Sequence, residues 1–216
     1  MKIKIDLFGE TTNWNKELNP ILKKYFHRKH PLEYQNLFQL IVMVVLSAQE
    51  SDKNINNIAP QLFNVFPTME SIANTTKKAL IPYLTAVKYH ENKIDWLIEI
   101  AKEIKTDKNI PLTLTALTSL KGIGRKSANV ILREAGRPAE GIITDLHVIR
   151  VAPRIGIITS TKNGLKAEKE LMAILPKEIW NEAGMAISFL GREICRPIPK
   201  CDQCPITNCC KYLKKI

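Results

Sequence analysis

The cysteines of this chain are its most concentrated source of metal-binding chemistry. All five lie after residue 194, and they are Cys195, Cys201, Cys204, Cys209 and Cys210. Thiols crowded into one segment cannot form a disulfide framework for a whole protein, and clustered cysteines in a reducing compartment bind metal more often than they pair. Four thiolates suit either an iron–sulfur cluster or zinc. The tail therefore predicts the ligand set of one metal centre.

Gly122 and Gly124 flank Ile123 in a turn that separates two predicted helices. Glycine adopts backbone dihedrals that other residues resist, and its lack of a side chain lets another backbone approach closely. The second helix begins near Arg125, so its N–H groups and the positive end of its dipole face the turn and favour phosphate. This helix-hairpin-helix pattern is typical of proteins that bind a nucleic-acid backbone without reading sequence. The alternative is an ordinary helix corner with a glycine cap.

Lys126 lies in the first turn of the second hairpin helix. The helix dipole and the neighbouring Arg125 both disfavour the charged ammonium, and the neutral amine is the nucleophilic form. A nucleophilic lysine at this place would form a covalent bond with an electrophilic carbon. A lysine that only contacts phosphate is an equally good interpretation of the sequence alone.

Asp145 stands where the N-cap of a helix is expected, ahead of the apolar residues Val148, Ile149 and Val151. A capping role is the simpler interpretation. A carboxylate at the mouth of a cleft, near a lysine, could instead be a catalytic group. Such a carboxylate would favour the charged amine and so oppose the effects that act on Lys126, and the sequence leaves that balance open.

The elements that must position these residues are helices. Apolar residues recur at spacings of three and four through most of the chain, and no segment alternates long enough to predict a strand. The predicted helices span residues 14–26, 37–48, 52–66, 69–73, 77–84, 91–104, 114–120, 125–135, 145–155, 163–175 and 178–192. The segment 37–48 is apolar nearly all round, which indicates a helix buried in a domain core. The fold class is therefore all-α, with a loop-like cysteine tail.

Charge and composition restrict the class of protein. The chain carries 32 Lys and Arg against 21 Asp and Glu, a net charge of +11, which favours a polyanionic partner such as nucleic acid or an anionic membrane surface. A basic, well-solvated surface would give the same charge. The first residues lack the apolar stretch of a secretory signal, and the longest apolar run, 37–46, is far too short to span a bilayer. We therefore expect an intracellular protein with reduced thiols.

Four blocks in the same order resemble endonuclease III, within the helix-hairpin-helix superfamily of DNA repair glycosylases. The blocks are residues 46–52 (LSAQESD), 120–129 (LKGIGRKSAN), 144–151 (TDLHVIRV) and 191–195 (GREIC), the last leading into the cysteine tail. The resemblance covers nearly the whole chain, and the four blocks together are very specific. It implies a two-domain α fold: a six-helix domain carrying the hairpin over residues 29–140, and an iron–sulfur cluster domain formed by residues 1–28 plus 141–216, with DNA in the cleft between them.

The resemblance also implies a reaction. Lys126 falls on the family's catalytic lysine, and Asp145 falls on its catalytic aspartate. The implied reaction flips the damaged base out of duplex DNA, forms a Schiff base between Lys126 and C1′ of the sugar, and nicks the strand by β-elimination. A lysine at this position separates bifunctional glycosylase/lyases from relatives that only release the base.

DNA contacts and the cofactor follow from the same resemblance. Gln49 matches a residue that fills the gap left by the flipped nucleotide, and Tyr89 stands where the family inserts an apolar wedge into the opposite strand. Gly122, Gly124 and Arg125 are expected to bind the phosphate backbone. A [4Fe–4S] cluster is implied, with Cys195, Cys201, Cys204 and Cys210 as its ligands.

The chain departs from the family pattern at several places. The first gap between cysteines, residues 196–200, is one residue shorter than usual; in the family this basic loop is shaped against DNA by the cluster. The final gap selects Cys210, but a slip to Cys209 stays open. Lys88-Tyr89-His90 replaces the usual Gly-Leu-Tyr, and Leu146 replaces a common threonine. These differences bear on the preferred lesion more than on the chemistry.

We therefore expect a base-excision-repair enzyme, a bifunctional DNA glycosylase and AP lyase that removes oxidised pyrimidines and nicks abasic sites. Its partner would be double-stranded DNA with damaged or abasic nucleotides, and we expect a cytoplasmic, nucleoid-associated monomer without membrane attachment. One alternative is a monofunctional glycosylase for another lesion, with Lys126 only binding phosphate. The other is a non-catalytic DNA-binding iron–sulfur protein.

Overall fold

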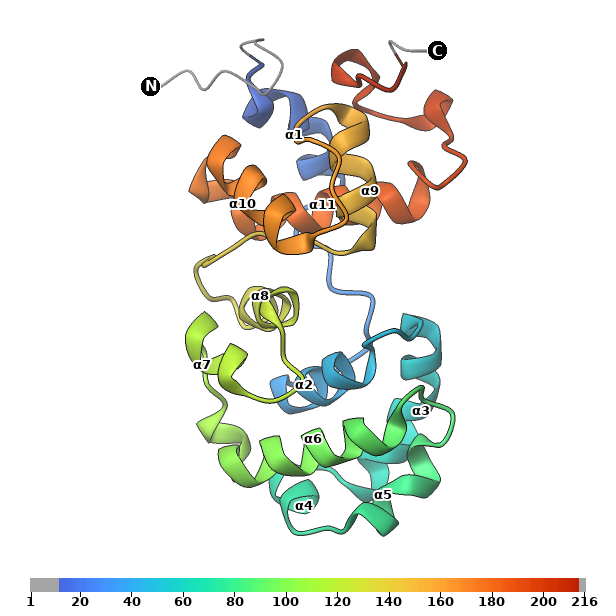
Figure 1. Cartoon of the computed structure of the whole chain (residues 1–216), viewed down its shortest axis with the longest axis vertical. Helices are drawn as coiled ribbons and strands as arrows, with labels where there is room; N and C mark the ends of the chain where they lie inside the picture. The colour runs from blue at the N-terminus through green and yellow to red at the C-terminus, as the bar shows by residue number, and fades with distance from the viewer. Residues whose placement is uncertain (1–11, 214–216) are drawn as a thin grey trace. The chain divides into compact units, whose positions relative to one another are not determined.

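The computed structural model describes residues 12–213, and its regular structure in that range is entirely helical (Figure 1). The α-helices are α1 (Trp14–Lys24), α2 (Leu37–Leu46), α3 (Asp52–Val65), α4 (Met69–Ala73), α5 (Lys77–Leu84), α6 (His90–Ile104), α7 (Leu114–Ser119), α8 (Arg125–Glu134), α9 (Leu146–Ile155), α10 (Gly164–Ile174) and α11 (Trp180–Glu193). Short 3-10 helices are η1 (Asp107–Asn109), η2 (Lys177–Ile179), η3 (Cys201–Gln203) and η4 (Thr207–Cys209). The all-α prediction is confirmed.

Polar side chains explain where these helices begin. Asn13, Asn36 and Ser51 cap α1, α2 and α3, and each side-chain oxygen accepts a hydrogen bond from the backbone N–H three residues on, at 3.2, 2.9 and 3.1 Å. Thr68 and Ser71 form a reciprocal capping box at α4. Because these caps are readable in the sequence, the helices begin within two residues of the predicted starts.

Contacts divide the chain into two units. The first, called here the hairpin unit, is Lys29–Arg137 and holds α2 to α8. The second, the tail unit, joins the described residues up to Arg28 with those from Pro138 onward, and it holds α1, α9, α10, α11 and the cysteines. The resemblance implied a hairpin domain over residues 29–140, and the contact-based unit ends at Arg137.

Helix α2 forms the centre of the hairpin unit. All of its residues except Leu37 and Gln39 are buried, and it packs against α3, α6 and α8. The Phe38 ring meets the Phe63 ring of α3 edge-on, with 5.6 Å between ring centroids. An apolar helix covered on all sides accounts for the continuous apolar run in the sequence.

Helices α9 and α11 form the centre of the tail unit, and α1 packs on α11. Two glycines of α11 permit this close packing. A Cβ atom at Gly184 would lie 2.4 Å from the carbonyl oxygen of Ile143, and one at Gly191 would lie 2.9 Å from Cβ of His147. The segment that carries Asp145 is therefore pressed directly against α11.

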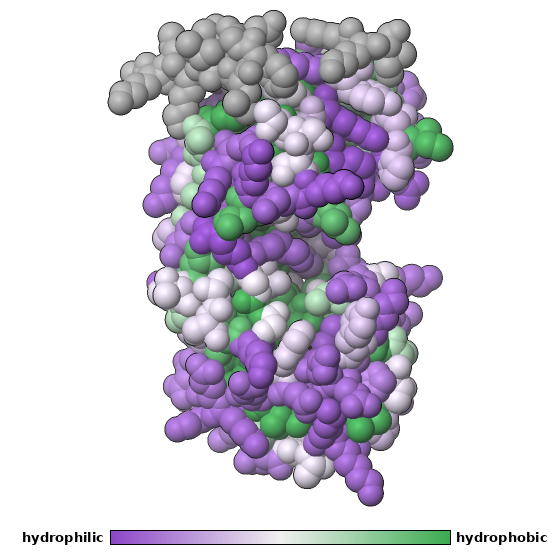
Figure 2. Space-filling model, in the orientation of Figure 1, coloured by the Kyte–Doolittle hydropathy of each residue, from purple (hydrophilic) through white to green (hydrophobic). Residues whose placement is uncertain are grey.

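The surface is mostly polar where Figure 2 shows it, and hydrophobic residues there occur in small separate groups. The large hydrophobic side chains that are most exposed include Tyr89, Leu146 and Ile198. Within residues 12–213, no helix combines the length and the apolar character needed to cross a membrane.

Candidate active site and cysteine centre

The hairpin turn between α7 and α8 has the local geometry that the two glycines predicted. Gly122 has a φ of +82°, in the left-handed region, and a Cβ atom there would lie 2.7 Å from Cε3 of Trp96 on α6. Ile123 is buried, and its N–H donates to the Leu120 carbonyl at 3.1 Å. The turn is thus fixed from inside by Ile123 and from outside by the Trp96 ring.

Contacts within the chain do not explain why residue 124 is a glycine. It is the N-cap of α8, it contributes no side-chain hydrogen bond to the helix, and its φ of −83° is open to other residues. A Cβ atom at this position would meet no atom of the chain within 4 Å. The first turn of α8 carries Arg125 and Lys126 and no acidic residue, so the helix start favours an anion. The protein itself does not require a glycine here, whereas a backbone or phosphate that approaches closely would.

Lys126 is exposed in this first turn, in the hairpin unit. Asp145 belongs to the tail unit, where it caps α9. Its Oδ1 accepts from the backbone N–H groups of His147 and Val148, both at 2.9 Å, so the capping role is present. Its Oδ2 accepts from the Ser188 hydroxyl at 2.6 Å and lies 3.6 Å from Nη2 of Arg192. The carboxylate is therefore held in one orientation from both sides.

Gln49 and Tyr89 are two exposed residues of the hairpin unit with unusual backbones. Gln49 has a φ of +60° in the connection between α2 and α3, and Tyr89 has a φ of +55° directly before α6. The Tyr89 side chain does not pack into the core, since 62% of the residue is exposed. The structure therefore presents both predicted DNA-contacting side chains to solvent on strained loop positions.

Four cysteines of the tail surround one cavity. Those four are Cys195, Cys201, Cys204 and Cys210. The rest of the lining is mostly apolar and includes Ile155, Leu190 and Ile194. Among the described side chains of His, Cys, Asp and Glu, no group of three is arranged as the ligands of a metal ion. The four thiols instead line this small cavity, which is called the chamber below.

Cys209 does not line this chamber. Its Sγ lies 3.4 Å from the Ile206 carbonyl oxygen, to which it donates, and burial raises the pKa of its thiol to about 12. Cys210 is buried, with its Sγ 3.9 Å from the Arg154 carbonyl oxygen. The geometry therefore favours Cys210 over its neighbour as the fourth member of the set.

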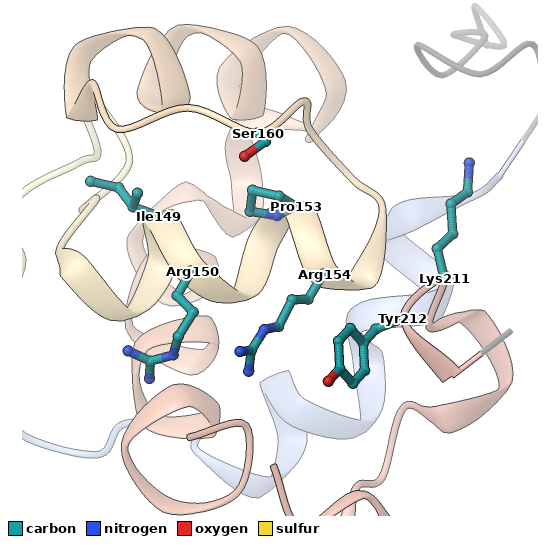
Figure 3. A pocket seen from close by; sticks show the side chains of 7 residues that line it. All are labelled: Ile149, Arg150, Pro153, Arg154, Ser160, Lys211 and Tyr212. Atoms are coloured by element: carbon teal, nitrogen blue, oxygen red, sulfur yellow. The ribbon is translucent and has the colours of Figure 1, made fainter. Parts of the chain in front are cut away.

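Two arginines of α9 hold the first cysteine loop. Arg150 donates to the carbonyls of Gly191 and Cys195 at 2.9 and 3.2 Å. Arg154 donates to the carbonyls of Arg196 and Pro197 at 2.6 and 3.0 Å. Both side chains leave the same side of α9, beside a cleft of about 410 Å³ (Figure 3). The path of the loop is thus set by contacts to its main chain.

Comparison with known proteins identifies the family. The family described as "HhH-GPD superfamily base excision DNA repair protein" matches residues 42–177. Endonuclease III of Bacillus subtilis is 33% identical over 202 residues, which cover 92% of this chain and 91% of the relative. This chain belongs to the endonuclease III family. Endonuclease III of Haemophilus influenzae is 30% identical, over 94% of this chain and 99% of its own length.

Solved structures agree with this membership of the endonuclease III family. A trapped endonuclease III–DNA covalent intermediate superposes with a TM-score of 0.83 at 30% identity, covering 94% of this chain and 96% of that one. A thermostable thymine-DNA glycosylase, at 18% identity and a TM-score of 0.79, shares the fold. The protein is therefore a base-excision DNA-repair enzyme of the DNA glycosylase/AP lyase class.

Ser188 and Arg192 are site residues that the sequence interpretation did not single out. They lie four residues apart on α11, hence on one face, and both meet the Asp145 carboxylate. Ser188 is fully buried in an otherwise apolar stretch of α11. A buried hydroxyl requires a hydrogen-bond partner, so a serine inside that stretch was the available signal.

Proposed function

We propose that this endonuclease III family member is a bifunctional DNA glycosylase and AP lyase that acts on oxidised pyrimidines and abasic sites in double-stranded DNA. The proposal rests above all on Lys126, an exposed lysine in the first turn of α8, directly after a turn whose outer glycine leaves room for a phosphate. A protein that only binds DNA would need neither an amine at that position nor an oriented carboxylate at the start of α9.

The proposed reaction uses few groups of the protein. The lesion nucleotide leaves the stack, because C1′ cannot be reached inside the duplex. The Asp145 carboxylate stabilises positive charge that develops on the sugar, and the Lys126 amine attacks C1′ while the bond to the base breaks. The C1′–O4′ bond then breaks, with the amine proton passing to O4′, and this opening of the sugar ring gives the Schiff base. Loss of a proton from C2′ of the Schiff base expels the 3′ phosphate, which nicks the strand.

The direct test is borohydride trapping on a duplex that carries one oxidised pyrimidine or one abasic site. Borohydride reduces a Schiff base to a stable amine, so we expect a covalent protein–DNA adduct together with a nicked strand. Release of the base without adduct or nick would show a monofunctional glycosylase. Binding that ignores the lesion and yields no product would show a non-catalytic DNA-binding protein. Either outcome would contradict the proposal.

The two hairpin glycines yield a paired prediction. Gly122→Ala is expected to destabilise the protein by about 1–3 kcal/mol, because alanine disfavours a positive φ and its Cβ would displace the Trp96 ring. Gly124→Ser should leave stability within about 0.5 kcal/mol, since serine is a good N-cap, and should still weaken DNA binding about tenfold by obstructing a phosphate. Urea unfolding and DNA titration measure the two effects. Equal loss of stability in both variants, or unchanged DNA binding by Gly124→Ser, would contradict the assignment.

We propose that the tail unit is a cluster domain and that Cys195, Cys201, Cys204 and Cys210 hold a [4Fe–4S] cluster. Three observations support the fit: four thiols share one chamber, its other walls are mostly apolar, and thiolates are the ligands such clusters take. Bound there, the cluster would supply a covalent cross-link between α11 and the end of the chain. The reaction itself requires no electron transfer from it.

The two adjacent cysteines allow this assignment to be tested. Cys210→Ser is expected to lose most of its iron and visible absorbance, because one ligand is removed from the chamber. Cys209→Ser should keep both, since its side chain lies outside the chamber and a serine hydroxyl can make the same bond to the Ile206 carbonyl. Iron analysis and absorbance of the purified variants decide between them. The reverse pattern would assign the fourth ligand to Cys209.

A further inference from the structure

Two neighbouring connections of the hairpin unit carry exposed residues in the left-handed region. Gln49 follows α2, and Tyr89 precedes α6. Residues other than glycine avoid this backbone conformation unless the surrounding contacts impose it. Two charged residues, Lys93 and Glu50, hold the backbone next to both positions.

Lys93 lies in the first turn of α6 and is 2% exposed. Its Nζ donates to the carbonyl oxygens of Leu46 and Ala48, at 2.8 and 2.6 Å, at the end of α2. Terminal helix carbonyls lack partners within the helix and carry the negative end of its dipole, so an ammonium suits them. The backbone N–H of Lys93 also donates to the Tyr89 carbonyl at 3.2 Å. Lys93 thus holds both the backbone that precedes Gln49 and the start of α6, which follows Tyr89.

Glu50 joins the same two connections from the other side. Its Oε1 accepts from the backbone N–H of Lys88 at 2.7 Å, and its Oε2 accepts from Nδ2 of Asn54 at 3.2 Å. That amide also donates to the Ala86 carbonyl at 3.1 Å. The residue after Gln49 is therefore bonded to the residue before Tyr89. The backbones of the two connections are therefore tied to each other.

A buried lysine is costly to retain for folding alone, because burial disfavours its charge and lowers its pKa. In this network the buried charge instead binds two loops whose exposed outer residues make no contribution to the core. We propose that Lys93 and Glu50 are positioning residues that hold Gln49 and Tyr89 as one rigid pair, fixed before DNA binds and ready to enter the base stack at the lesion. This inference rests on the proposed function and on the expectation, drawn from the resemblance to the family, that both side chains contact DNA.

Lys93→Met tests the inference, because methionine fills the buried space but makes neither hydrogen bond. We expect single-turnover base release from a lesion duplex to slow by about 10-fold to 100-fold, as for other displacements of positioning groups. In a Gln49→Ala/Tyr89→Ala background the same substitution should slow it by less than about threefold, because the residues it positions are gone. Lys102→Met, at an exposed lysine of the same helix, is the matched control and should behave as wild type.

A second readout separates positioning from a general loss of structure. Cleavage of an abasic site in single-stranded DNA requires no entry into a base stack, so Lys93→Met should retain its borohydride adduct there. Equal slowing by Lys93→Met in both backgrounds would overturn the inference, as would full activity of the Gln49→Ala/Tyr89→Ala protein on the lesion duplex. In either case the single-stranded adduct would show that the proposed lyase function stands. Absence of that adduct from the wild type would instead reject the proposed function.

Glu50 provides a variant that leaves the core intact, in case Lys93→Met does not fold. Glu50→Ala removes the acceptor of the Lys88 N–H and should slow base release about tenfold on the lesion duplex only. Glu50→Gln keeps one carbonyl oxygen for that bond and should restore most of the rate. No difference between Glu50→Ala and wild type on the lesion duplex would overturn the inference.

Discussion

Lys126→Ala is expected to form no borohydride adduct and to lower strand nicking at an abasic site by about 10³-fold or more, because the only proposed nucleophile is removed. The folded protein should be as stable as wild type. Lys126 is exposed, so no cavity results, and the change removes a cation from the unfavourable end of the α8 dipole. Gel analysis of trapped adducts and urea unfolding measure the two effects.

Lys121→Ala is the matched control for this experiment. Lys121 is an exposed lysine of the same hairpin and lies 3.1 Å from the Glu99 carboxylate. Its loss should change DNA binding modestly through net charge and leave the adduct intact. An undiminished adduct from Lys126→Ala would place the nucleophile elsewhere. A variant that still releases the base but no longer nicks would assign Lys126 to the lyase step alone.

Asp145→Asn should lower the rate of base release by roughly 10²- to 10⁴-fold with little change in stability. Asparagine is as good an N-cap as aspartate, and its Oδ1 can accept from the N–H groups of His147 and Val148 as the carboxylate does. What is lost is the negative charge that would stabilise the sugar cation, together with the ion pair to Arg192; Ser188 must then bond to the amide in place of the carboxylate. The substitution therefore separates the two roles that the sequence left open for this residue.

Asp145→Ala completes the comparison, because it removes both the charge and the cap. It should be as inactive as Asp145→Asn and also less stable by about 1 kcal/mol. Single-turnover kinetics and urea unfolding of the two variants provide the measurement. If Asp145→Asn retained wild-type rates while Asp145→Ala lost activity with stability, the residue would be only a cap.

The helices were the most predictable part of this fold, for a local reason. Their apolar spacing and their caps lie within a few residues of each other along the chain. Most disagreements are at the ends: α2 ends at Leu46 instead of residue 48, and α9 begins at Leu146 because Asp145 is its cap. The end of a helix depends on which of its terminal backbone groups find hydrogen-bond partners. At the end of α2 that partner is Lys93, which is distant in sequence.

The supporting contacts of the site were not predictable in the same way. Ser188 and Arg192 meet Asp145 only because α11 folds against α9, and nothing near Asp145 in the sequence indicates them. The choice between Cys209 and Cys210 likewise depends on which side of a short 3-10 turn faces the chamber. Spacing indicates a residue's type of chemistry, whereas its partners are set by tertiary packing.

The hydrogen bonds from Arg154 to the first cysteine loop have an evolutionary consequence. They end on the main-chain carbonyls of Arg196 and Pro197, and every amino acid supplies such a carbonyl. Selection is therefore free to change the side chains between Cys195 and Cys201 while the loop keeps its course. The net charge of the loop can therefore change without any alteration at the thiols, because neither hydrogen bond depends on the identity of a loop side chain.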